Sequence, residues 1–374
     1  MKILKRLPMI IFIAFIGIML LLFIFLPKKE YSPSEKRYLA EAPEFSSSSF
    51  FSGKFGEEFE KYLSDHTALR NFWVGLNSYY DYLSGNNGKN GYYLCKNGYI
   101  ITDPCEKNKL ETNLEVIKEF YNKTNIDTSL LVVPSTGYIC DDILPNKHLT
   151  YNDDDIFTDI TLSLENTNIN LIDIRNRFKE EYKSEKQLYY KTDHHWTSLG
   201  AYTAYKELGD VFAFSPNRES SYNISSIDNF YGTAYSSSGY WFTKPDTLEV
   251  WDNNKNCEVT IIDGANTINN DSCFFKDNLD GDDQYTVFLD GNHPYTKIIN
   301  PSSDNNNKLL IIKDSFAHCL TPFLVDHFKE ITMIDMRYYK EKVSDLINKE
   351  DFNNLLYVYS IDNFCTDGDL AWLE

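Results

Sequence analysis

Two short segments of the chain concentrate side chains that could carry out acid–base or nucleophilic chemistry. The first runs from Lys191 to Ser198 and holds Asp193, a tryptophan and two of the seven histidines, His194 and His195, just before a predicted helix. In an extended backbone, residues two positions apart point to the same side, so Asp193 and His195 share a side and His194 faces the other. A carboxylate beside an imidazole fixes its tautomer and stabilises its protonated form. This spacing predicts an acid–base pair made by Asp193 and His195.

The second segment places a serine where an apolar strand ends and a helix begins. The apolar run 309–312 is followed by Lys-Asp-Ser, in which Ser315 is the last residue, and a helix is predicted from Ala317. The hydroxyl of such a serine lies at the carboxyl edge of the sheet, close to helix N–H groups that can stabilise an oxyanion. The alternative is that Ser315 only caps the helix. With the acid–base pair, Ser315 completes the parts of a Ser–His–Asp triad.

A third candidate is the pair Gly291 and Asn292, which follows a short apolar run. A glycine N–H and an asparagine amide could both donate hydrogen bonds to an oxyanion, although the same pair is also typical of an ordinary turn. The remaining histidines have no comparable context. His318, on the helix predicted after Ser315, is expected to be a surface or packing residue.

Strands and helices alternate along most of the chain, which indicates an α/β fold with a mainly parallel sheet covered by helices. A hairpin is predicted at 90–101. Residues 214–306 interrupt the alternation and are rich in Ser, Asn, Asp, Gly and Thr. They are interpreted as a β-rich insertion packed against the carboxyl edge of the sheet. The predicted strands cover 129–133, 168–172, 308–312, 330–334 and 355–359, and the predicted helices cover 54–83, 106–122, 155–165, 198–208, 317–328 and 339–349.

The N-terminal region differs from the rest of the chain. Residues 7–26 form an uncharged apolar run that, as a helix, could cross the roughly 30 Å hydrocarbon core of a bilayer. A cleaved signal peptide is the alternative, but it needs a shorter apolar region and a small-x-small cleavage site, which the following residues lack. We therefore expect a cytoplasmic basic segment at 1–6, a transmembrane signal anchor at 7–26, a linker at 27–54 and one extracytoplasmic α/β domain at 55–374, held at the cell membrane.

Composition excludes several classes of function. The chain has 374 residues with a formal net charge of −19, and a surface that acidic repels phosphate backbones, so nucleic acid is not an expected partner. The hydrophobic fraction of 42% and the aromatic fraction of 15% exclude global disorder. Seven cysteines lack the spacing of zinc sites, and we expect neither a metal nor a cofactor. The pairs Cys95/Cys105 and Cys257/Cys273 are close enough in sequence to be disulfide candidates.

The segment Asp193–Trp196, followed by Thr-Ser-Leu-Gly-Ala-Tyr, resembles the signature of the DHHW family of bacterial envelope proteins. These proteins are similar to the SGNH-hydrolase-like acetyltransferase domains of alginate O-acetylation proteins. The resemblance extends to Gly291–Pro294, to Lys313–Ser315 and to the segment Asp335–Tyr338.

The resemblance implies an SGNH-hydrolase-like fold and a role for each matching residue. Asp193 would be the orienting acid, His195 the base and Ser315 the nucleophile, whereas His194 carries no implied role. Gly291, Asn292, Trp196 and Tyr338 are the oxyanion or substrate candidates. One departure is that Lys313 and Asp314 replace the glycine-containing turn that is usual before the serine.

Three functions are compatible with these residues. The leading hypothesis is a membrane-anchored O-acetyltransferase or acetylesterase that acts on a cell-envelope or exported polysaccharide through an acyl-serine intermediate. The resemblance implies that a membrane-bound O-acyltransferase delivers the acyl group. One alternative is a metal-dependent phosphoesterase of the DHH type, suggested by Asp-His-His. The other is a non-catalytic scaffold that binds polysaccharide, with aromatic residues stacking on sugars at Tyr235, Tyr240, Trp241 and Trp251.

Overall fold

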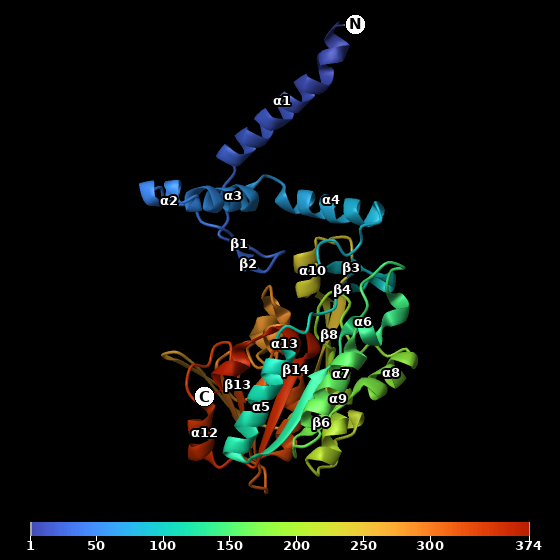
Figure 1. Cartoon of the computed structure of the whole chain (residues 1–374), viewed down its shortest axis with the longest axis vertical. Helices are drawn as coiled ribbons and strands as arrows, with labels where there is room; N and C mark the ends of the chain where they lie inside the picture. The colour runs from blue at the N-terminus through green and yellow to red at the C-terminus, as the bar shows by residue number, and fades with distance from the viewer. Residues whose placement is uncertain (1, 374) are drawn as a thin grey trace. The chain divides into compact units, whose positions relative to one another are not determined.

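The computed structural model describes residues 2–373, which divide into two compact units (Figure 1). Within the described residues, unit 1 comprises residues 2–86 together with Tyr235–Phe242, and unit 2 comprises Asn87–Ala234 together with residues 243–373. The α/β unit therefore begins at Asn87 and not at residue 55, where the sequence analysis placed its start. Residues 235–242 leave the β-rich insertion because they pack with the N-terminal helices.

Unit 1 opens with the apolar helix α1 (Lys2–Phe25). Among the described residues, α1 is the one helix long and apolar enough to cross a membrane, with a mean hydropathy of 3.0 over its most apolar window within Arg6–Phe25. Three short elements lie in the expected linker, and two longer helices follow it. These elements are β1 (Tyr31–Ser32), β2 (Arg37–Tyr38), α2 (Ser47–Phe51), α3 (Lys54–His66) and α4 (Arg70–Leu83).

The single helix expected over residues 54–83 is wrong, because the chain turns between α3 and α4. Leu69 adopts a left-handed conformation with φ of 59°, which interrupts the helical hydrogen bonding. The Thr67 hydroxyl donates to Leu63 O at the end of α3, at 2.7 Å. Neither glycine nor proline marks this turn, so the apolar periodicity runs through it unchanged.

Unit 2 is built on an eight-stranded sheet with the order β10-β9-β11-β13-β12-β14-β5-β6. The five strands from β13 to β6 pair in parallel, which confirms the mainly parallel core expected from the sequence. The strands are β5 (Asp127–Val133), β6 (Asn170–Ile172), β9 (Glu258–Asp263), β10 (Asn266–Asn270), β11 (Tyr295–Ile299), β12 (Lys308–Lys313), β13 (Glu330–Ile334) and β14 (Asn354–Ser360).

The insertion at 214–306 is β-rich, and it contributes to the sheet in two places. Strands β9, β10 and β11 continue the central sheet in antiparallel pairing beyond β13, whereas Thr233 and Tyr285 contact Asp193 and His195 at the carboxyl edge, where the insertion was expected to pack. Pairing of β11 with β13 covers an edge that would otherwise expose unpaired backbone groups. The insertion also contributes the two-stranded sheet of β7 (Asn223–Phe230) and β8 (Asp246–Asp252).

Helices cover both faces of the central sheet, so the strands are apolar on both sides. Leu131 and Leu309 face one core, whereas Leu130 and Leu310 face the other. The first core is closed by α6 (Thr136–Ile139), α8 (Arg175–Lys183), α9 (Ser198–Val211) and α11 (Phe316–Leu324), and the second by α5 (Leu110–Thr124), α7 (Asp153–Leu164), α12 (Val343–Glu350) and α13 (Ile361–Thr366).

Two further features complete the description. The expected hairpin is present as β3 (Tyr92–Leu94) and β4 (Ile100–Thr102), and α10 covers Thr233–Ser238. All seven cysteines lie within the described residues, and each is a free thiol there. Of the two disulfide candidates, Cys257 and Cys273 are adjacent, with their Sγ atoms 3.4 Å apart.

Candidate active site

Three serines stand at the carboxyl ends of neighbouring parallel strands: Ser135 after β5, Ser315 after β12 and Ser360 at the end of β14. Ser135 and Ser360 are helix N-caps, since their side chains accept hydrogen bonds from Tyr138 N and Asn363 N. Ser315 precedes α11, but its side chain makes no capping hydrogen bond. The alternative interpretation as an N-cap therefore does not describe the Ser315 hydroxyl.

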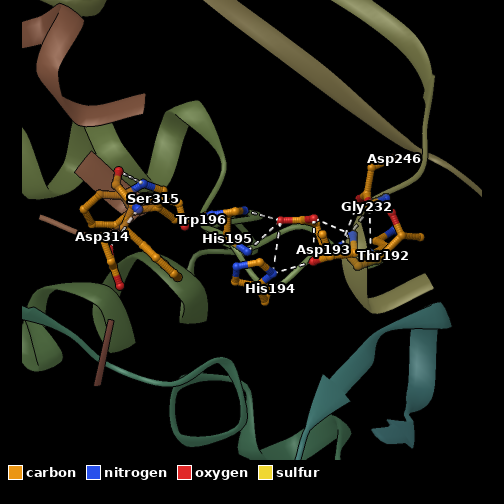
Figure 2. Close-up of polar contacts among 12 residues, drawn as sticks. Thr192, Asp193, His194, His195, Trp196, Gly232, Asp246, Asp314 and Ser315 are labelled. Carbon is orange, nitrogen blue, oxygen red and sulfur yellow. Dashed lines mark hydrogen bonds and ion pairs between the residues drawn. The ribbon is translucent and has the colours of Figure 1, made fainter. Parts of the chain in front are cut away.

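The Ser315 hydroxyl instead contacts the imidazole of His195 (Figure 2). Ser315 Oγ lies 2.6 Å from His195 Nε2, and His195 Nδ1 lies 2.5 Å from Asp193 Oδ1. All three residues are buried. With the Nδ1 proton donated to the carboxylate, Nε2 keeps the lone pair that can accept the Ser315 proton. This order of contacts is what a base-activated serine nucleophile requires.

Asp193 is held by a neighbouring segment that the sequence analysis did not identify. Thr233 donates to Asp193 Oδ2 through its backbone N–H at 2.7 Å and its hydroxyl at 3.2 Å. Burial alone would raise the pKa of Asp193, but the charges of His195 and His194 and the hydrogen bonds from His195 and Thr233 hold that pKa well below its ordinary value. Asp193 is therefore ionised at neutral pH and can stabilise an imidazolium.

Gly232 lets this segment approach the carboxyl group. A Cβ atom added at Gly232 would lie 2.1 Å from Asp193 Cβ and 2.2 Å from Asp193 Oδ2. Non-bonded atoms do not approach one another that closely, so a side chain at position 232 requires Asp193 to move. No sequence signal marks this contact, because Gly232 lies far along the chain from Asp193.

The two adjacent histidines do not face opposite ways, contrary to the expectation from an extended backbone. Their ring centroids lie 3.9 Å apart, because residues 191–195 form a series of bends. His194 Nδ1 lies 2.5 Å from Thr233 Oγ1 and 3.9 Å from Asp193 Oδ1. Burial and the neighbouring His195 lower the pKa of His194 to about 4. His195 differs from His194 in its contacts, because His195 Nε2 lies beside Ser315 Oγ and His194 Nδ1 lies beside Thr233 Oγ1. The alternation of side chains along the backbone does not separate the two histidines.

Aromatic rings fix the position of the His195 imidazole. Tyr285 stacks on it with centroids 3.9 Å apart, and Phe316 lies at 5.0 Å. Trp196 is fully buried, and its indole N–H donates to Phe316 O at 3.1 Å. Trp196 was expected to be a substrate candidate, but its ring is enclosed by the core and is not available to stack on a sugar.

Asp314 builds the turn before the serine in place of a glycine. Its Oδ2 accepts hydrogen bonds from the N–H and hydroxyl of Ser360, which ties β12 to β14. Its Oδ1 accepts from Phe316 N, and its carbonyl oxygen accepts from Ala317 N. The first N–H groups of α11, which were expected to face an oxyanion, are therefore already occupied.

The other oxyanion and substrate candidates lie on two loops at the same edge of the sheet. Gly291 follows two residues that also have positive φ, and its N–H donates to Phe288 O, so it is used within the turn. Asn292 Oδ1 accepts from Arg337 Nη2 at 3.0 Å, so this contact does not use the Asn292 amide N–H groups. Tyr338 is half exposed and can contact a substrate.

Sequence reasoning missed a buried ionic network beside the serine. Lys313 Nζ lies 2.9 Å from Asp335 Oδ2 and 2.7 Å from His318 Nε2. Arg337 also binds Asp335, at 2.6 Å. Lys313, Asp335 and His318 are all almost completely buried, so of the two roles expected for His318, surface or packing, the surface role is wrong. The spacing of three residues between Ser315 and His318 on one helix was the signal that could have found it.

The first alternative function needs a metal site, and one group of side chains could offer it. Asp193, His194 and His195 present ligand atoms that all lie within 4.8 Å of one another. However, Asp193 Oδ1 and His195 Nδ1 share a hydrogen bond, and His195 Nε2 lies within hydrogen-bond distance of Ser315 Oγ. A metal ion would have to displace these contacts to bind.

The comparisons with known proteins agree with this fold. Residues 162–334 match the DHHW protein family, and residues 88–222 match the SGNH hydrolase-like domain of the acetyltransferase AlgX. The chain is 22% identical over 182 residues to the probable alginate O-acetylase AlgJ of Pseudomonas aeruginosa, and the match spans 46% of each protein, about half the length of that relative. The expected resemblance is confirmed.

Two solved structures share the fold. A DHHW family protein from Eubacterium siraeum is 23% identical, with a TM-score of 0.64 over 75% of this chain and 94% of that one. Bacillus cereus PatB1, solved with a sulfonyl adduct, is 21% identical, with a TM-score of 0.63 over 75% of this chain and 99% of that one. Both similarities confirm the mixed α/β fold class.

Proposed function

We propose that this protein is a serine-dependent O-acetyltransferase or acetylesterase that acts on a cell-envelope or exported polysaccharide. The observation that carries the proposal is the continuous set of contacts from Ser315 Oγ through His195 to Asp193. A second support is the contrast with Ser135 and Ser360, which occupy equivalent positions on neighbouring strands but cap helices.

The reaction would proceed in two halves through an acetyl group on Ser315. His195 Nε2 takes the Ser315 proton as Oγ attacks the acetyl carbonyl, and Asp193 stabilises the resulting imidazolium. His195 then returns the proton to the leaving oxygen, which releases the donor and leaves acetyl-serine. In the second half, His195 takes the proton of a sugar hydroxyl or of water, and that oxygen attacks the acetyl carbonyl and releases Ser315.

The proposed location follows from α1. An uncleaved helix at Arg6–Phe25 would tether the α/β unit to the cell membrane, with the C-terminal domain outside the cytoplasm. The AlgJ relative is described as a probable alginate O-acetylase, and by that similarity we propose a polysaccharide as the acceptor here. A membrane-bound O-acyltransferase, which we propose as the source of acyl groups, would then lie in the same bilayer.

A sulfonyl fluoride is expected to label Ser315 in the full chain held in detergent. Bacillus cereus PatB1 carries a sulfonyl adduct, and a serine activated by an imidazole attacks sulfur, expels fluoride and forms a stable sulfonate ester. Mass spectrometry should place one adduct on Ser315, and labelling should abolish hydrolysis of an acetyl ester such as 4-nitrophenyl acetate.

Two matched variants make this test specific. Ser135→Ala removes a serine at the end of β5 that hydrogen-bonds Asp153, and it should still be labelled at Ser315. Ser315→Ala should not be labelled. Absence of labelling and of hydrolysis in the unmodified protein would contradict the proposal, whereas activity that disappears with a chelator would favour the metal-dependent alternative.

A further inference from the structure

Of the hydrogen-bond donors expected to hold the acyl oxygen beside Ser315, the backbone N–H groups are engaged elsewhere, whereas Asn292 binds Arg337 through its Oδ1 and not through its amide N–H groups. Phe316 N and Ala317 N donate to Asp314, and Gly291 N donates to Phe288 O. A serine nucleophile needs donors aimed at the oxygen that becomes negatively charged in the transition state. Another donor near Ser315 would therefore contribute to the reaction.

His318 offers such a donor, and its tautomer follows from its neighbour. Lys313 forms an ion pair with Asp335, so its Nζ is an ammonium group that has protons to donate and no lone pair. Because Lys313 Nζ lies 2.7 Å from His318 Nε2, that nitrogen must accept the hydrogen bond. The proton of a neutral His318 ring is then on Nδ1.

The Nδ1–H of His318 has no partner in the described part of the protein, although it is buried. An unpaired donor that is shielded from water costs stability, which is typical of groups reserved for a ligand. His318 lies one helical turn after Ser315, so both side chains occupy the same side of α11.

The charges around the ring keep it neutral. Burial lowers the pKa of His318 well below its ordinary value, and the positive charges of Lys313, His195 and Arg337 lower it further. A neutral imidazole donates from Nδ1 over the whole neutral pH range without itself becoming a competing base.

We propose that His318 Nδ1–H binds the acyl oxygen of the substrate and donates a hydrogen bond to the oxyanion formed when Ser315 attacks. The acyl oxygen would then be bound by a side chain, because the N–H groups of Phe316 and Ala317 already donate to Asp314. Lys313 and Asp335 act as positioning residues, because they select the tautomer of His318. The inference rests on the proposed serine chemistry and adds a residue to it.

Two conservative variants of His318 distinguish its hydrogen-bond donation from Nδ1 from its acceptance of the hydrogen bond from Lys313. The asparagine amide is attached at Cγ, as Nδ1 is in histidine, so His318→Asn keeps a donor at that position and loses the acceptor for Lys313. The glutamine amide begins one bond later, so His318→Gln keeps an acceptor for Lys313 near Nε2 and loses the Nδ1 donor. We expect His318→Gln to lose about a hundredfold in kcat for acetyl-ester hydrolysis, and His318→Asn to remain within about tenfold.

The measurements are kcat, KM and the rate of sulfonyl labelling of Ser315, made on full chains with matched melting transitions. If His318 only supported Lys313, His318→Gln would be the better enzyme, and that result would overturn the proposal. An unmodified protein that is inert toward both reagents would overturn the proposed function as well. Activity that is lost in Ser315→Ala but equal in both His318 variants would overturn only the role of His318.

Discussion

Replacing Ser315 or His195 with alanine is expected to lower acetyl-ester hydrolysis by about a thousandfold or more, and replacing both is expected to cost little beyond that. The two residues act as one unit, because the hydroxyl is nucleophilic only while His195 Nε2, 2.6 Å away, accepts its proton. Loss of either leaves only the residual catalysis that comes from binding. The measurement is kcat/KM for an acetyl ester with the full chain in detergent.

The adjacent histidine provides the control for this result. His194→Ala should retain most of the activity, because His194 Nδ1 contacts Thr233 Oγ1 and not the serine. Equal losses at His194 and His195, with unchanged melting transitions, would contradict the triad. That outcome would favour a site in which both rings hold a metal with Asp193.

Gly232→Ala is expected to reduce activity by about a hundredfold although residue 232 touches no substrate. The new Cβ would overlap Asp193, so the carboxyl group has to move by the order of an ångström, and misplacement on that scale costs about this much in rate. The effect should fall on kcat, since the acid that stabilises the imidazolium is displaced.

Gly368→Ala is the matched control, because a Cβ there would meet nothing closer than 3.5 Å, the flexible side chain of Lys109. It should leave activity unchanged. Both variants should be compared at equal fractions folded, established by melting. Full activity in a folded Gly232→Ala protein would show that Asp193 tolerates displacement and would contradict the role assigned to the contact.

The parallel core could be predicted because its strands are buried on both faces. Strands β12 and β14 each contain a run of consecutive apolar residues. Such a short run between amphipathic helices is typical of a parallel strand that is covered on both faces. The position of Ser315 followed from the end of one such run. The pairing of Asp193 with His195 was predicted from an extended backbone, but residues 191–195 bend and bring both histidine rings together, so the premise of that prediction was not met.

Other features depend on contacts between distant segments and leave no local signal. Thr233 and Gly232 reach Asp193 from the far end of β7, and the antiparallel strands β9 to β11 join the sheet because β13 would otherwise have an open edge. The polar helix α8 was not predicted either, since one core residue, Phe178, supplies most of its apolar contact. The spacing of His318 from Ser315 was a local signal, but nothing in the sequence shows that Lys313 would be buried beside His318.

The central place of β12 in the sheet has a consequence for how activity arises in time. Strand β12 lies between β13 and β14, both of which follow it in the chain, so its two neighbours are synthesised only after Ser315. A nascent polypeptide that already contains the acid, the base and the nucleophile therefore has no scaffold to align them. If the proposed triad is correct, the chain is expected to be inactive until its last strands have been synthesised, and a C-terminal truncation before β14 is expected to be inactive although it retains Asp193, His195 and Ser315.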